Sequence, residues 1–280
     1  MSLTSLDIIA LIAIVIVGTP HGAMDINLVL NASDERGKKI AAHVFYLLIA
    51  LLSFLAWASF TTASLALFLM ISTIHFGRSN PVGMALETIK VRWQGYAAVF
   101  FMGGIATVFI PALYWGEVSA LFEILGADTQ VIKGLGVVGV VVWAGSVVIS
   151  LALVRSKRAF IVCLVLCLIA LNKSVFSPLS LFGIYFCILH SSIHFLRAMR
   201  FLKAPIASPP TMFLVNTVLS WCLILAAYGF FLTEGDRPAA SLSALFAVLF
   251  ALTVPHMFLI DLLLPKFKPY WRLNLSVREL

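Results

Sequence analysis

Long apolar segments, separated by short basic loops, constrain the fold of this chain more than any other feature. About nine of them could cross a bilayer, since a spanning helix needs about 20 mostly apolar residues. Hydrophobic residues make up 62% of the 280 residues and charged residues only 11%, whereas a soluble domain has about 25% charged residues. Because so few polar side chains cannot cover a water-exposed surface, the sequence predicts an all-α, polytopic transmembrane helix bundle.

The expected spans follow one another without a linker, so residues 1–280 are interpreted as one integral-membrane catalytic domain. The first segment has neither a basic region nor a clear cleavage site, and we interpret it as a retained helix rather than a signal peptide. The nine expected spans are roughly 6–30, 41–58, 61–77, 95–115, 132–154, 159–172, 176–197, 211–232 and 240–264.

The 19 Lys and Arg residues test this division of the chain. All but Lys133, Lys173 and Arg237 fall in alternate loops or in the C-terminal tail. We expect the protein to lie in the cytoplasmic membrane. By the positive-inside rule, its N-terminus is then outside and its C-terminus is in the cytoplasm. The net charge of +7 therefore reflects topology and anionic lipid, and we expect no nucleic-acid partner.

Five of the six histidines lie inside expected spans at a similar depth, each in the last half or third of an odd-numbered span. They are His21, His75, His190, His194 and His256. An ionisable side chain inside a bilayer is costly and indicates a functional site, although a hydrogen bond between helices explains a single histidine equally well. Five at one level favour a shared site. His43, beside a basic loop, is interpreted as interfacial.

The imidazoles form a set that suits a metal ion. His190 and His194 are four residues apart and project from one helix face, and His21 and His75 bring the set to four neutral nitrogen ligands. Such ligands suit Fe, Cu, Zn or Ni. Zinc hydrolysis is disfavoured because no acid accompanies the pair as in HExxH. Haem needs only two axial histidines, so an Fe(II) site with vacant positions for O₂ fits better.

Two aspartates accompany the histidines. Asp25 lies four residues after His21 on the same helix face, where it can accept an N–H from a ligand histidine and fix the orientation of that ring. Asp261 follows His256 by five residues, and solvation of the helix end explains it at least as well. A proline directly precedes His21 and another precedes His256, and each is expected to bend its helix.

Four segments of the chain resemble the bacterial and archaeal Brp/Blh family, integral-membrane β-carotene dioxygenases that make retinal. They are Thr19–Asp25 (TPHGAMD), Ile74–Gly77 (IHFG), Tyr185–Phe195 (YFCILHSSIHF) and Leu252–Asp261 (LTVPHMFLID). The resemblance implies Fe(II)-dependent cleavage of the central double bond of β-carotene by O₂, and transfer of the retinal to a microbial rhodopsin.

The resemblance also implies roles for individual residues. The iron ligands would be His21, His75, His190 and His194, and His256 would line the site rather than bind the metal. We therefore assign catalytic roles beside the iron to His256 and Asp25. The chain departs from the family at Asn80, where members often carry an acid, and at the small serines after His190. These departures concern the ends of the substrate rather than the ligands.

Two other classes of protein share some of these features. A membrane diiron hydroxylase or desaturase acting on another lipid would need several histidine clusters, and the chain has one HxxxH pair. A metal or haem transporter, or a membrane cytochrome, is the non-enzymatic alternative. Transporters place carboxylates and broken helices near the midplane, and apart from Asp25 the expected spans are nearly free of carboxylates.

Overall fold

The computed structural model describes residues 3–25, 28, 35–80, 92–153, 157–201, 210–232 and 236–263, and in these ranges it contains helices and no strand. The predicted all-α class is confirmed. The helical elements, π-helical segments included, are α1 Ser5–Ala13, η1 Ile14–Gly18, α2 Pro20–Ala23, α4 Arg36–Ser59, α5 Thr61–Ser79, α7 Arg92–Gly104, η2 Ile105–Phe109, α8 Ile110–Leu113, α9 Trp115–Ile124, α10 Thr129–Leu153, α11 Lys157–Leu171, α12 Pro178–Gly183, η3 Ile184–Ser191, α13 Ser192–Phe201, α14 Pro210–Leu232, α15 Arg237–Met257 and η4 Phe258–Leu263.

Seven helical segments within the described ranges are long and apolar enough to cross a membrane. This supports a multi-pass membrane protein. The segments are Ser5–Ala23, Ile40–Ser59, Trp93–Leu113, Thr129–Ala152, Pro178–Met199, Phe213–Leu232 and Arg237–Leu263.

The two other expected spans are helical but differ from these seven. α11 has 15 residues, fewer than the roughly 20 that a span needs. α5 carries His75, Arg78 and six serines or threonines. The count of nine spans and the outside position of the N-terminus are therefore not confirmed and stay predictions. The division of the sequence into spans also missed α9, which follows Tyr114 and lies mostly between the expected spans 95–115 and 132–154, where a loop was expected.

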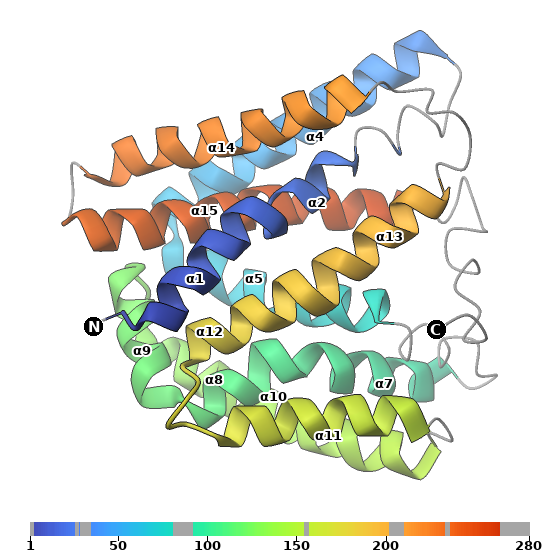
Figure 1. The fold of residues 1–280 in the computed structure, drawn as a ribbon, viewed down its shortest axis with the longest axis vertical. Helices are drawn as coiled ribbons and strands as arrows, with labels where there is room; N and C mark the ends of the chain where they lie inside the picture. Colours follow the sequence, from blue (N-terminus) through green and yellow to red (C-terminus); the bar gives the residue numbers. More distant parts are fainter. Residues whose placement is uncertain are drawn as a thin grey trace.

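The long helices lie side by side and roughly parallel to one another, with α15 inside the bundle (Figure 1). α15 packs against α4, α14 and α5, and 72% of an apolar 18-residue stretch of its span is buried, whereas only 11% of the corresponding stretch of the α10 span is buried. α1–α2, α12–α13 and α15 run in the same direction along the bundle (Figure 1). Histidines near the C-terminal ends of these helices therefore come to one level.

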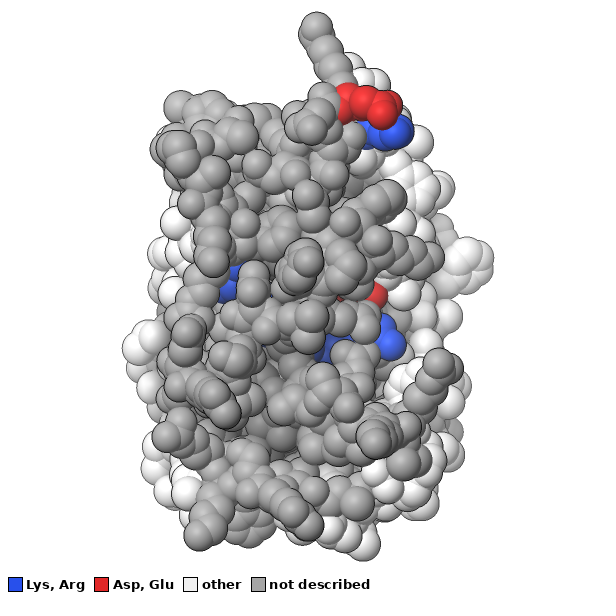
Figure 2. Space-filling model, turned by 90° about the vertical axis from the view of Figure 1, so that its right-hand side faces the viewer, with Lys and Arg blue, Asp and Glu red and all other residues white. Residues whose placement is uncertain are grey.

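The sides of the bundle are apolar, and the exposed charges of the described residues lie near its ends. On α10, Val138, Val141 and Val148 are 63%, 67% and 69% exposed. Contiguous exposed apolar surface is unusual on soluble monomers, and it suits contact with lipid. Figure 2 looks onto the end of the bundle at which α13 ends, where described Lys and Arg side chains reach the surface.

Two glycines bring the backbones of α5 and α7 into contact. A Cβ on Gly77 would lie 1.9 Å from the carbonyl oxygen of Val99, and a Cβ on Gly103 would lie 1.7 Å from that of Thr73. Small residues allow membrane helices to approach this closely. Because Gly77 follows His75 by two residues, the contact determines where that histidine stands in the bundle.

Gly103→Ala is expected to destabilise the bundle by roughly 1–3 kcal/mol, as overpacking does, because the added methyl group must displace the carbonyl of Thr73. Thermal unfolding of the detergent-solubilised protein measures this change as a lower Tm. The control is Gly145→Ala on α10, where the added Cβ would meet no described atom within 4 Å apart from its chain neighbours and the adjacent backbone of its own helix. Equal Tm values for Gly103→Ala and Gly145→Ala would contradict the close approach of α5 and α7.

Candidate metal centre

Three helices that carry the histidines change from α- to π-helical winding close to them. η1 lies just before His21, η3 contains His190 and η4 follows His256. π-Helical turns are rare and occur mostly at functional sites. The change of winding is found beside both prolines, Pro20 and Pro255, that were expected to bend their helices.

Pro20 explains the local geometry of the first helix. The amide of Thr19 donates to the carbonyl of Ile14 at 2.8 Å, as in a π-helix. The next bond of this kind, to the carbonyl of Val15, would need an N–H from Pro20, which has none. The Val15 carbonyl accepts instead from the hydroxyl of Thr19 at 2.8 Å and from the indole N–H of Trp221 on α14 at 2.9 Å. A neighbouring helix therefore stabilises the bend.

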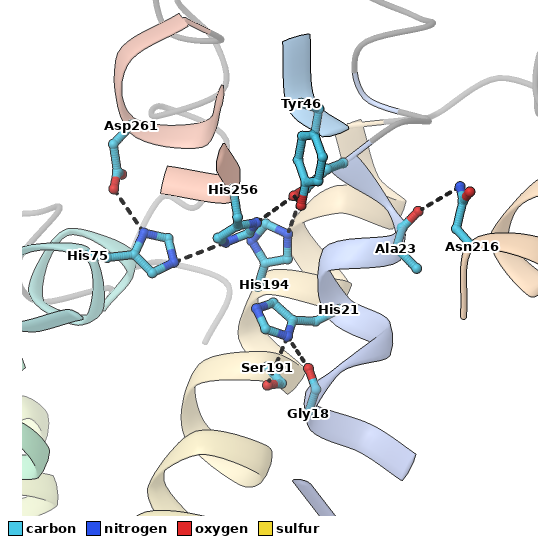
Figure 3. Close-up of polar contacts among 11 residues, drawn as sticks. Gly18, His21, Ala23, Tyr46, His75, Ser191, His194, Asn216, His256 and Asp261 are labelled. Carbon is cyan, nitrogen blue, oxygen red and sulfur yellow. Dashed lines mark hydrogen bonds and ion pairs between the residues drawn. The ribbon is translucent and has the colours of Figure 1, made fainter. Parts of the chain in front are cut away.

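The five histidines expected at one level form a single cluster, four of whose rings are shown in Figure 3. The ring centroid of His21 lies 5.2, 5.5 and 5.1 Å from those of His190, His194 and His256. The ring of His75 lies 4.9 Å from that of His190 and 4.8 Å from that of His256. All except His21 are at most 5% exposed. The structure thus brings the four predicted ligands and His256 together.

Each aspartate accepts a hydrogen bond from one of these histidines. Nδ1 of His256 donates to Oδ2 of Asp25 at 2.7 Å, and Nδ1 of His75 donates to Oδ2 of Asp261 at 2.8 Å. Asp25 is fully buried and Asp261 is 9% exposed. Asp261 therefore belongs to the cluster, and its alternative explanation by solvation of the helix end is wrong.

The histidine partner of Asp25 does not lie on its own helix. The spacing suggested His21, but Nδ1 of His21 donates to the carbonyl of Gly18. The reason is that α2 ends at Ala23, so four residues do not make one regular turn there. Oδ1 of Asp25 also lies 4.0 Å from Nε2 of His194, and this acid beside the HxxxH pair was not predicted from sequence spacing.

Two polar side chains at the site were not singled out from the sequence. Tyr46 on α4 donates to Oδ2 of Asp25 at 3.1 Å. Arg197, expected in a basic loop, is only 5% exposed and donates to the carbonyl of Ser79 at 2.8 Å. A cation is favourable at this C-terminal end of α5. Arg197 follows His194 by three residues, and this spacing could have indicated that it lies near the site. The contact of Tyr46 with Asp25 depends on how α4 packs and has no such signal in the sequence.

The cluster has the properties of a metal site. Nδ1 of His190 and Oδ1 of Asp25 are buried and make no hydrogen bond within the described part of the chain, and a cation in the cluster would satisfy the nitrogen and offset the charge of the carboxylate. A void of about 10 Å³ lies between four of the imidazoles, roughly the room for one water-sized group. Two groups of side chains have potential ligand atoms within 4.8 Å of one another, namely His21, His190 and His256, and Asp25, His194 and His256.

Two larger apolar cavities lie near this void. A cavity of about 60 Å³ shares Phe68, Ser72 and Phe182 with the void. A cavity of about 800 Å³ between α5, η2 and α10 shares Leu69 and Thr107 with the smaller one. Small-molecule sites have volumes of roughly 300–1,000 Å³. A series of neighbouring apolar cavities therefore extends from the histidines toward the lipid-facing helix α10.

Comparison with known proteins identifies the family. Residues 12–264 match the family described as beta-carotene 15,15'-dioxygenase. A protein named beta-carotene 15,15'-dioxygenase from the uncultured marine bacterium 66A03 is 33% identical over 281 residues, which cover 96% of this chain and 97% of that protein. The chain belongs to the β-carotene 15,15'-dioxygenase family. No solved structure matches it.

Membership of the β-carotene 15,15'-dioxygenase family confirms the family that the four motif segments predicted, and all four segments lie within the matched residues. It also confirms the prediction of a dioxygenase rather than a transporter. The histidine cluster of this dioxygenase stands next to apolar cavities, which is the arrangement that an enzyme acting on an apolar substrate needs.

Asp25→Asn is expected to lower the affinity for the metal roughly 10–100-fold, as the loss of a hydrogen bond next to the ligands of a metal does. The amide removes the negative charge and one of the acceptor oxygens next to His256. Metal bound per chain, measured by mass spectrometry after dialysis against graded chelator, gives the affinity. Glu117→Gln, at an exposed carboxylate of α9, is the matched control. Wild-type affinity in Asp25→Asn would leave Asp25 with a structural role only.

Proposed function

We propose that the protein uses Fe(II) and O₂ to cleave the central double bond of β-carotene, giving two molecules of all-trans-retinal. The observation that supports this most is the buried cluster of five histidines at the end of a series of neighbouring apolar cavities. Imidazole nitrogens suit iron, and O₂ and β-carotene both dissolve in the bilayer interior. The relative named beta-carotene 15,15'-dioxygenase supports the choice of substrate.

The residues of the cluster have distinct proposed roles. His21, His75, His190 and His194 hold the iron, which when bound supplies the activation of O₂. Each carbon of the cleaved double bond gains one oxygen atom, so all atoms of O₂ and substrate appear in the two retinals. Because no proton is removed from the hydrocarbon, no general base is needed. Asp25 has the role of orienting and polarising the site through its hydrogen bond with a histidine.

The series of cavities is the proposed path of the substrate. The cavity of about 800 Å³ is lined mainly by aliphatic and aromatic side chains of α5, η2 and α10, so a hydrocarbon can enter it from the bilayer interior without leaving a polar group unsatisfied. One half of β-carotene lies along this route, with its central double bond beside the histidines. Ser72 lines both the void and the next cavity, and it is the proposed narrow point of the path.

The protein is proposed to cross the cytoplasmic membrane nine times, with the N-terminus outside. The alternating distribution of Lys and Arg supports this topology, and α5 and α11 supply the eighth and ninth helices. As the family resemblance implies, a microbial rhodopsin is the proposed recipient of the retinal.

His190→Ala is expected to abolish retinal formation, because it removes a metal ligand whose partner His194 stands one turn away. The measurement is retinal and residual β-carotene, by chromatography, in bacterial cells that make β-carotene and express the protein. The amount of protein in the membrane fraction is followed in parallel. His43→Ala is the control and should form retinal normally. Normal retinal in His190→Ala would remove His190 from the site, and none in the wild type would exclude the function.

Ser72→Leu is expected to slow cleavage by about tenfold or more, the size of effect that an extra methylene group has in a tight pocket. The hydroxyl of Ser72 makes no hydrogen bond within the described ranges, so the variant changes the width of the path and removes no contact. Bound metal should stay unchanged. Ala63→Leu, at an exposed position of the same helix, is the control. A wild-type rate in Ser72→Leu would show that the substrate takes another path.

A further inference from the structure

We infer that His256 is a ligand of the metal, held in place by Asp25, and does not only line the site. The inference rests on the proposed metal site and adds a fifth nitrogen to it. Its starting point is one distance in the cluster: Nε2 of His256 lies 3.1 Å from Nε2 of His75 (Figure 3).

The two aspartates determine which ring nitrogens carry protons. An ionised carboxylate accepts hydrogen bonds and donates none, so Nδ1 carries the proton in both His256 and His75. The other nitrogen of a neutral imidazole then has a lone pair and no proton. Two lone pairs therefore face each other across 3.1 Å in a buried site, and a cation between them is needed to make this contact favourable.

A metal ion meets this need at the observed distance. Imidazole nitrogens bind a metal such as zinc at about 2.0–2.1 Å, so two of them on adjacent positions of one ion are roughly 3 Å apart. A shared proton would also bridge the two nitrogens, but it would satisfy only these two. Nδ1 of His190 is buried without a hydrogen bond in the described structure, and a metal ion accounts for this nitrogen as well.

His256 also stands at the centre of the cluster. Its ring centroid is 5.1 Å from that of His21, 4.8 Å from that of His75 and 5.0 Å from that of His194. Among the described residues it is common to both groups of side chains whose ligand atoms converge. Because its Nε2 lies close to Nε2 of His75, a metal ion bound to Nε2 of His75 would lie next to Nε2 of His256.

The charges around the cluster agree with this arrangement. Burial of an uncompensated charge is very costly, and neutral imidazoles do not offset the charge of a divalent ion. Asp25 and Asp261, each one histidine away from the ion, carry two negative charges and polarise the rings that they bond. Five nitrogen ligands leave one of six octahedral positions open. A hydrocarbon substrate has no atom that binds a metal, so it does not need an open position on the metal.

His256→Asn is the variant that tests this role with least disturbance. The amide nitrogen of Asn can take the place of Nδ1 and keep the hydrogen bond to Asp25, whereas the ligand nitrogen is lost. The full-length protein in detergent is titrated without oxygen with Co(II), whose visible absorption bands report the number and kind of ligands. The affinity for Co(II) is expected to fall by about tenfold or more, which is at least the effect of removing a hydrogen-bond partner of a metal ligand. The visible absorption bands of Co(II) should also shift.

A second variant separates a ligand from a merely structural residue. In His256→Ala, free imidazole can fill the vacated space, and we expect it to restore the wild-type Co(II) bands. His43→Ala is the matched control and should keep the wild-type bands throughout. Wild-type bands and affinity in His256→Asn would overturn the inference, as would loss of Co(II) binding in both variants that imidazole does not restore. Co(II) binding is independent of turnover, so absence of retinal in the wild type would exclude the proposed function and leave this test intact.

Discussion

The burial of polar groups among lipid-facing helices is the constraint on which the rest of the structure depends. A bilayer offers no water to an imidazole or a carboxylate, so each must find its partner within the bundle. Here the partners are one another: Asp25 bonds His256, Asp261 bonds His75, and Tyr46 also donates to Asp25. A divalent ion among these groups would be held by nitrogens and balanced by carboxylates.

The fold supplies the positions that this arrangement needs. α15 lies inside the bundle, which brings His256 to the middle of the cluster. Gly77 and Gly103 bring α5 against α7 and so determine the position of His75. Pro20 causes a π-helical turn whose carbonyl is satisfied from α14, and this turn presents His21 to its neighbours. Features that weaken a regular helix are thus concentrated where the histidines meet.

The sequence was sufficient for the helical class and for the common depth of the histidines, because both follow from the apolar segments along the chain. It was not sufficient for contacts between distant segments. Asp25 and His256 are 231 residues apart, and their pairing follows from helix packing rather than from spacing. The spacing of Asp25 and His21 was misleading because the helix ends between them. Arg197 was assigned to a loop by its charge, although it is buried at the end of α5.

X-ray absorption at the iron edge, on the purified wild-type protein loaded with Fe(II) without oxygen, tests most directly whether the histidine cluster is a non-haem metal centre. We predict about one iron per chain, a first shell of nitrogen and oxygen atoms, and the outer scattering of several imidazole rings. A first shell with sulfur, the scattering pattern of a porphyrin, or a protein that binds no stoichiometric metal would contradict this assignment.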